Sequence, residues 1–172
     1  MKTKIIRKCW NIILTFILII ALFFVIAFIG VRLIGLTPYI VTSGSMEPQY
    51  PVGSLIYVKE VKPENINVGD AITFYMGEDK VVATHQVYEI DRENQMFYTQ
   101  GINNKDSNGN IIHDVSPVSS SSIIGIPVFH IPYLGYINKM CTTAPGIYIL
   151  VGIAIIILII SFLLDGNGRK NK

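Results

Sequence analysis

The sequence predicts a small, mostly β domain of antiparallel, curled or barrel-like type, flanked by two transmembrane helices. Two apolar runs are each long enough to cross a bilayer, and about 108 residues lie between them. Within this middle segment, short β-branched and aromatic runs alternate with turn residues, and no helical period persists.

The first apolar run, Ile12–Val31, contains one polar residue, Thr15. Twenty helical residues rise about 30 Å, the thickness of a hydrocarbon core. A cleavable signal peptide would also have a basic head and an apolar run. However, this run exceeds the usual core of 7–15 residues and no Ala-x-Ala-like site follows it. We therefore expect a retained anchor helix in residues 11–36.

The second run, Gly146–Leu164, is uncharged and nearly all apolar, and Asp165 follows it. A buried core helix would show a polar face, which this run lacks. We expect a second transmembrane helix in residues 145–164.

Charge is distributed unevenly along the chain. The tails at 1–10 and 165–172 are basic, whereas the middle segment has six Lys and Arg against eleven Asp and Glu, a net charge of −5. The positive-inside rule therefore predicts a multi-pass protein of the cell membrane, with both termini cytoplasmic and residues 37–144 outside. The basic tails are topology signals and indicate the lipid bilayer as partner, with no nucleic acid.

The two cysteines, Cys9 and Cys141, then fall on opposite sides of the membrane and are not expected to pair. No His, Cys and Asp cluster has the spacing of metal ligands, so the sequence predicts neither a metal nor a cofactor.

The outer segment, 37–144, is expected to form one β domain. Its predicted strands are Tyr39–Val41, Leu55–Val61, Ala71–Tyr75, Val81–Ile90, Met96–Gln100 and Ile123–Phe129. Gly-, Asn- and Pro-rich turns separate them. The polar stretch Ile102–Asn110 is expected to be a long loop, a kind of segment that often lines a site.

A candidate nucleophile lies in Ser43-Gly44-Ser45-Met46-Glu47-Pro48, shortly after the first helix. A tight turn containing glycine can present a hydroxyl and backbone N–H groups to one point. A serine becomes a nucleophile only when a base takes its proton.

Three histidines lie in the outer segment: His85, His113 and His130. His85 shares a strand face with Ala83 and Val87, a position more typical of a hydrogen-bonded core residue. As a base, it would need a carboxylate to fix its tautomer. Asp106 and Asp114 both lie where they could supply one, and spacing alone does not choose between them.

Five motifs occur in an order that resembles the type I signal peptidases of the histidine-using branch, found in the endoplasmic reticulum, in archaea and as the Gram-positive minor type. They are Ser43-Gly44-Ser45-Met46-Glu47-Pro48, Asn67-Val68-Gly69-Asp70-Ala71-Ile72-Thr73-Phe74, Ala83-Thr84-His85-Gln86-Val87, Tyr98-Thr99-Gln100-Gly101-Ile102-Asn103-Asn104, and the closing segments Ile123-Ile124-Gly125 and Ile131-Pro132-Tyr133-Leu134-Gly135-Tyr136.

The resemblance implies a membrane-bound serine endopeptidase that cleaves N-terminal signal peptides from preproteins after small residues at −1 and −3, near the Sec translocon. It implies Ser45 as nucleophile and His85 as general base. The Ser45 N–H and the Ser43 hydroxyl are the oxyanion donors that it suggests. Substrate would bind as an extended strand against an edge of the domain.

The chain departs from the family pattern at two positions. Gln86 replaces the usual Arg, and Ile102 stands where the family's first Asp is normally found. Counting back from Ile123 favours Asp114 as the family's second Asp, whereas counting forward from Gly101 favours Asp106 or neither. The backward count crosses no apparent insertion, so Asp114 is preferred.

Two other interpretations remain open. A catalytically inactive two-anchor protein whose β domain binds a partner would explain the missing Asp at 102, but it would not need Ser45 and His85 together. A lysine-based peptidase would use Lys80, beside Glu78 and Asp79 at a turn that is expected to be solvated. A lysine base needs desolvation to lower its pKa, which disfavours this interpretation.

Overall fold

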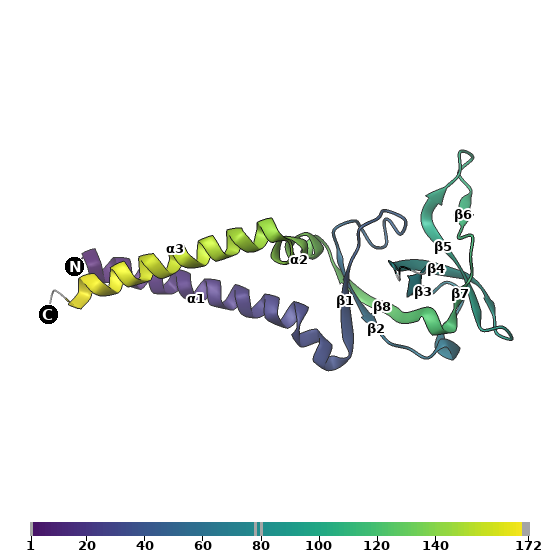
Figure 1. Ribbon diagram of the computed structural model, residues 1–172, viewed down its shortest axis with the longest axis horizontal. Coiled ribbons are helices and arrows are strands. Elements are labelled where there is room, and N and C mark those ends of the chain that lie inside the picture. The colour runs from purple at the N-terminus through teal and green to yellow at the C-terminus, as the bar shows by residue number, and fades with distance from the viewer. Residues whose placement is uncertain (1, 78, 80, 170–172) are drawn as a thin grey trace. The chain divides into compact units, whose positions relative to one another are not determined.

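The computed structural model describes residues 2–77, 79 and 81–169 (Figure 1). The chain divides into two compact units: a helical unit made of residues 1–30 and 137–172, and a β unit, Val31–Tyr136. Each unit is described by itself. Lys80, the base in the lysine-peptidase alternative, lies outside the described residues.

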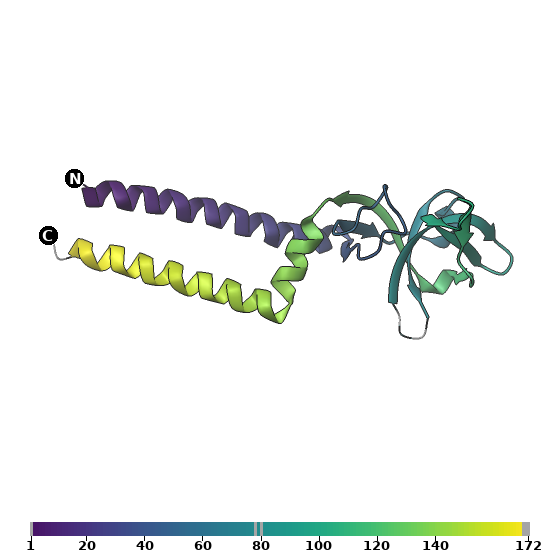
Figure 2. The same ribbon diagram turned by 90° about the horizontal axis from the view of Figure 1, so that it is seen from above.

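The helical unit contains α1 (Lys2–Phe28), most of α2 (Leu134–Thr142) and α3 (Ala144–Arg169). Ile5–Phe28 and Ala144–Leu164 are long and apolar enough to cross a membrane. Near the chain ends, α1 and α3 lie side by side: Arg7 Nη2 donates to the Leu164 carbonyl at 2.6 Å, and Trp10 Nε1 donates to Ser161 Oγ at 3.1 Å (Figure 2). In the view of Figure 1 the two helices diverge away from this end.

The anchor segment expected at 11–36 is helical only as far as Phe28. A short 3₁₀ helix, Gly30–Ile34, follows, and the first strand already begins at Leu36. Gly35, which has φ +79°, makes this transition in a backbone conformation that suits glycine.

The β unit contains eight strands in chain order. They are β1 (Leu36–Ile40), β2 (Leu55–Lys59), β3 (Ala71–Met76), β4 (Val81–Asp91), β5 (Met96–Lys105), β6 (Ile111–His113), β7 (Val118–Ser119) and β8 (Ile123–Ile131). Two further 3₁₀ turns are Pro63–Asn65 and Ser120–Ser122.

All strand pairs are antiparallel and follow the order β1-β2-β8-β3-β4-β5-β6, with β7 paired to β5. Strand β8 joins the two halves of the sheet, since its C-terminal part pairs with β2 and its N-terminal part with β3. Gly125 on β8 lies so close to the Lys59 carbonyl that no side chain would fit there. Within the described residues no pair joins β1 to β6, so the sheet is curled and open.

Among the described residues, two apolar clusters support the sheet. The first consists of Ile66, Ile72, Phe74, Val87, Phe97 and Val118. The second consists of Met46, Tyr50, Ile56, Val58 and Ala71, with Ile102 packed against it. The second cluster therefore lies directly beneath the turn that carries Ser45.

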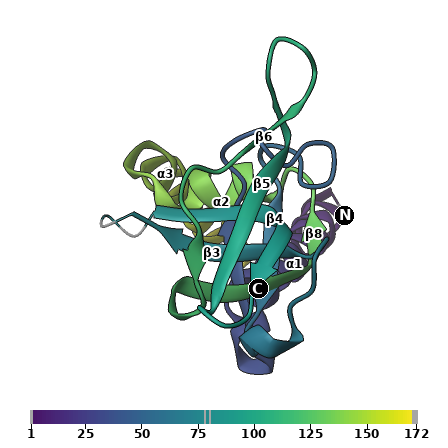
Figure 3. The same ribbon diagram turned by 90° about the vertical axis from the view of Figure 1, so that its right-hand side faces the viewer.

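The predicted fold class is confirmed: an antiparallel, mostly β structure with a helix of membrane-spanning length on each side in sequence. All six predicted strands form. The predicted loop Ile102–Asn110 is wrong in its first part, because β5 continues to Lys105 and pairs with β6 in a hairpin (Figure 3). The short strands β6 and β7 and the helix α2 were not predicted. Their apolar patterns are too short or too polar to stand out from a loop.

Candidate active site

The turn that follows β1 holds Ser45 in a fixed position. Glu47 N–H donates to the Gly44 carbonyl at 3.1 Å, and Tyr50 N–H donates to the Met46 carbonyl at 2.9 Å. Met46 is 2% exposed and lies in the second cluster. Because its neighbour in sequence is buried, Ser45 is held at the surface of the core with its side chain half-buried.

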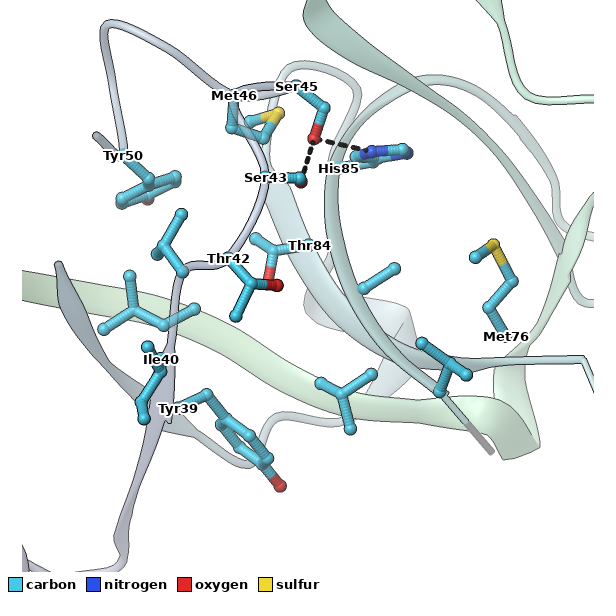
Figure 4. A pocket seen from close by; sticks show the side chains of 15 residues that line it. Tyr39, Ile40, Thr42, Ser43, Ser45, Met46, Tyr50, Met76, Thr84 and His85 are labelled. Atoms are coloured by element: carbon cyan, nitrogen blue, oxygen red, sulfur yellow. Dashed lines mark hydrogen bonds between the residues drawn. The ribbon is translucent and has the colours of Figure 1, made fainter. Parts of the chain in front are cut away.

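His85 on β4 faces this serine. His85 Nε2 lies 3.1 Å from Ser45 Oγ, and Ser43 Oγ lies 3.2 Å from the same oxygen (Figure 4). The pairing of β4 with β3 fixes this position, with Ile72 opposite His85. Ile72 is fully buried, so the strand cannot slip without disturbing the core.

Asp114, just after β6, is the third member of a hydrogen-bonded row that runs from Ser45 through His85. Its Oδ2 lies 2.6 Å from His85 Nδ1 and accepts a second hydrogen bond from Thr99 Oγ1, also at 2.6 Å. The Asp114 N–H donates to the Thr99 carbonyl at 2.9 Å, which ties its backbone to β5. The side chains of His85 and Asp114 are 13% and 22% exposed, so the pair is shielded from water without being sealed from it.

The electrostatics suit an ionised carboxylate. Partial burial acts to raise the pKa of Asp114, but the hydrogen bonds from His85 and Thr99 outweigh it and hold the pKa below its ordinary value of 3.8. A carboxylate only accepts hydrogen bonds, so the proton between this pair belongs on His85 Nδ1. Nε2 is then free to accept a proton from Ser45.

Asp106, the other candidate carboxylate, lies elsewhere. It sits at the tip of the β5–β6 hairpin, exposed, and accepts hydrogen bonds from the N–H groups of Asn108 and Asn110 at 2.8 Å each. The bond from the Asn110 backbone is the main cause that lowers the pKa of Asp106. The structure thus brings Asp114, not Asp106, to His85.

The other two histidines contact aromatic rings and not Ser45. His113 stacks on Tyr88 with ring centroids 3.9 Å apart, and His130 lies edge-on to Tyr50 at 5.6 Å. Among the residues that the structure describes, no group of three or more His, Cys, Asp or Glu side chains could hold a metal ion.

A pocket of about 280 Å³ opens beside Ser45 and His85 (Figure 4). One wall is the segment from β1 to the serine turn, and the other is the first half of β4 with the end of β3. The lining residues are Tyr39, Ile40, Val41, Thr42, Ser43, Ser45, Met46, Tyr50, Ile56, Met76, Val81, Val82, Ala83, Thr84 and His85. Burial raises the pKa of Tyr39 and Tyr50, so both present neutral phenols. Among its described lining residues the pocket therefore has no Asp, Glu, Lys or Arg, and polar and apolar side chains both contribute to its walls.

The outer edge of β4 is unpaired along this pocket. Strand β5 pairs with β4 only from Gln86 onward, whereas β3 covers the opposite edge from Val81 to Gln86. Within the described residues, Val81–His85 therefore offers free backbone N–H and C=O groups on the pocket side.

Three residues around the site were given no role from the sequence, although they stand in the Tyr98–Asn104 motif: Thr99, Gly101 and Asn103. All lie on β5. Thr99 bonds Asp114, an ideal Cβ on Gly101 would lie 2.9 Å from Ser45 Cβ, and Asn103 bonds the serine turn. Their place in that motif was the available signal, but their partners come from segments distant in the sequence.

Comparison with known proteins agrees with this geometry. Residues 10–90 match the family described as signal peptidase, peptidase S26, a range that contains both Ser45 and His85. Signal peptidase I W of Bacillus subtilis (strain 168) is 37% identical over 92 residues, covering 52% of this chain and 45% of the relative. The signal peptidase complex catalytic subunit SEC11C of Homo sapiens is 26% identical over 110 residues, covering 62% of this chain and 57% of the relative.

The fold and the Ser–His–Asp row define a chain built like a serine peptidase of small antiparallel β type. More narrowly, residues 10–90 are similar to the signal peptidase S26 family, and the motifs of the chain resemble the histidine-using branch. The chain spans about half the length of the curated relatives it matches.

Proposed function

We propose that this protein is a membrane-bound serine endopeptidase that removes N-terminal signal peptides from preproteins. The observation that carries the proposal is the unbroken row from Ser45 Oγ through His85 to Asp114, at 3.1 and 2.6 Å. These three side chains come from separate segments of the chain. Their meeting beside an open pocket supports a catalytic role more than a structural one.

Catalysis would follow from the proton positions. Ser45 Oγ attacks the scissile carbonyl while its proton passes to His85 Nε2, and Asp114 stabilises the resulting imidazolium. His85 then gives the proton to the leaving amine, which leaves an acyl-enzyme on Ser45. A water molecule, deprotonated by the same His85, attacks the acyl group and releases the new carboxylate.

The oxyanion of each tetrahedral intermediate needs preorganised donors. The Ser43 hydroxyl, 3.2 Å from Ser45 Oγ, is close enough to the nucleophile to supply one (Figure 4). The Ser45 N–H is the second candidate, since no hydrogen bond within the described residues uses it.

Substrate would bind as an added strand along the free edge Val81–His85 of β4. Backbone hydrogen bonds would hold it in an extended conformation, and alternate side chains would enter the pocket beside Ser45 and His85. This arrangement suits the uncharged small residues expected at −1 and −3.

The membrane assignment completes the proposal. The two helices of membrane-spanning length and the basic tails support anchorage in the bilayer, with both termini cytoplasmic and the β unit outside. The outer location would bring the β unit to the side where preproteins emerge from a translocon such as Sec.

The direct test is cleavage of a precursor that carries an N-terminal signal peptide with Ala at −1 and −3, by the full chain purified in detergent. Wild type should release the mature product, and Ser45→Ala should not. Equal cleavage by both would overturn the assignment of Ser45. Cleavage by neither, with the wild type folded, would favour the inactive binding protein as the alternative.

A further inference from the structure

Strand β5 passes along the whole catalytic row. Successive side chains of a strand point to opposite faces, so Thr99 and Gly101 share one face, and Asn103 lies two residues further along the same strand. The burial of β5 follows the same alternation, with Phe97, Thr99 and Gly101 buried. We propose that Thr99 and Asn103 are positioning residues that hold the two ends of the Ser45–His85–Asp114 row in register. This inference rests on the proposed function.

At one end, Thr99 holds the carboxylate. Thr99 is 1% exposed, and its hydroxyl donates to the same Asp114 oxygen that accepts from His85, at the same 2.6 Å distance. The reciprocal backbone bond from Asp114 to Thr99 keeps the two residues together. Two donors on one oxygen leave the carboxylate little freedom to rotate, so the imidazole is held in a single orientation.

At the other end, Asn103 holds the nucleophile turn. Its backbone N–H donates to the Ser45 carbonyl at 2.9 Å, and its side-chain Nδ2 donates to the Gly44 carbonyl at 3.0 Å. Two successive carbonyls of the turn are thus fixed from β5. The turn itself contains glycine and would otherwise be free to move.

Between these ends, Gly101 is in contact with the nucleophile. Any side chain there would meet Ser45 Cβ and the Asn104 amide. Because Thr99 and Asn103 belong to one strand, the distance between them along β5 fixes the distance between the Asp114 carboxylate and the Ser45 turn. Rigid elements hold catalytic geometry better than loops do.

The Thr99 test compares Thr99→Val, which removes the hydroxyl and keeps the shape, with Thr99→Ser, which restores it. Thr73→Val is the matched control, because Thr73 is also fully buried and its hydroxyl bonds Thr84 at 2.8 Å, not a member of the row. Each variant is assayed as full chain in detergent on the Ala −3, Ala −1 precursor.

We expect Thr99→Val to lower kcat by about tenfold to a hundredfold with KM unchanged, as for loss of a hydrogen bond to a charged group. Thr99→Ser should recover most of the loss. The pKa of Asp114 should also rise in Thr99→Val, as a pH titration of that carboxyl group would show, because one of the donors that lowers it is lost. A merely structural role would move none of these and would make Thr99→Val resemble Thr73→Val, overturning the proposal.

The Asn103 test uses Asn103→Ala and Asn103→Asp, with Asn94→Ala as control. Asn94 is also exposed and uses its Nδ2 in a local bond, to Asp91 at 2.7 Å, away from the row. Asn103→Ala should lower kcat roughly threefold to tenfold with KM unchanged, and Asn103→Asp should lower it more, since a carboxylate repels the Gly44 carbonyl.

Failure of this inference is distinguishable from failure of the proposed function. If wild type cleaves the precursor and Ser45→Ala does not, the function stands whatever the β5 variants do. Under that result, wild-type kcat in both Thr99→Val and Asn103→Asp would refute the positioning role alone.

Discussion

The variant Asp114→Asn tests whether the hydrogen bond between His85 and Asp114 serves catalysis or is an ordinary structural contact. Asp114 Oδ2 accepts hydrogen bonds from both His85 and Thr99. In Asp114→Asn, an amide nitrogen at that position would donate to His85 Nδ1, placing the ring proton on Nε2. His85 could then no longer accept the proton of Ser45. If the amide oxygen took that position instead, the orientation would survive but the charge that stabilises the imidazolium would not.

The expected loss of kcat follows from the role of Asp114 as the carboxylate of a Ser–His–Asp triad. Removal of the carboxylate from a Ser–His–Asp triad costs about 10⁴ in kcat, which is about 5 kcal/mol of transition-state stabilisation. The assay is kcat and KM for the signal-bearing precursor, at equal concentrations of folded protein judged by circular dichroism in detergent.

Asp106→Asn is the matched control, since it exchanges the other candidate carboxylate at the exposed hairpin tip. It should leave kcat unchanged and weaken only the hydrogen bonds at the tip of the β5–β6 hairpin. Near-normal turnover in Asp114→Asn with collapse in Asp106→Asn would refute the reasoning. Normal turnover in both variants would mean that a Ser45–His85 dyad suffices.

Three further outcomes are expected. Gly101→Ala should lower kcat sharply in a folded protein, because its Cβ would lie 2.9 Å from Ser45 Cβ, and an unchanged kcat would contradict that close approach. Phe97→Ala should lower the stability of the β unit by about 3–5 kcal/mol, since Phe97 is 2% exposed in the core; an unmoved thermal midpoint in detergent would argue against this core. The stability advantage of wild type over Asp114→Asn should be full above pH 3.8 and fade as pH falls through the lowered pKa of Asp114, which urea unfolding at several pH values would measure.

The linear sequence determined most of the local structure. Apolar runs of about twenty residues have few structural outcomes, so the two long helices could be predicted from length and composition alone. Alternating β-branched runs bounded by turn residues likewise identified the six main strands. The serine turn and the histidine strand were identifiable because their motifs are short and contiguous.

The sequence was weakest where a residue's partner is distant along the chain. Asp106 and Asp114 have similar local surroundings, and counting residues could only prefer one of them. The pairing of β6 with β5 decided their positions, since Gln100 lies opposite His113 and Asp114 follows directly, whereas Asp106 is left at the hairpin tip. Strand register is a tertiary property, fixed by which faces are buried.

Thr99 and Asn103 illustrate the same limit. A buried threonine and an exposed asparagine on a strand are ordinary in sequence, and only the folding of β5 across the site gives them Asp114 and Gly44 as partners. The chain by itself determined which groups of atoms were present and which segments would be rigid. The tertiary structure alone decided which of these groups meet, because hydrogen bonds act over about 3 Å and depend on packing between segments far apart in the sequence.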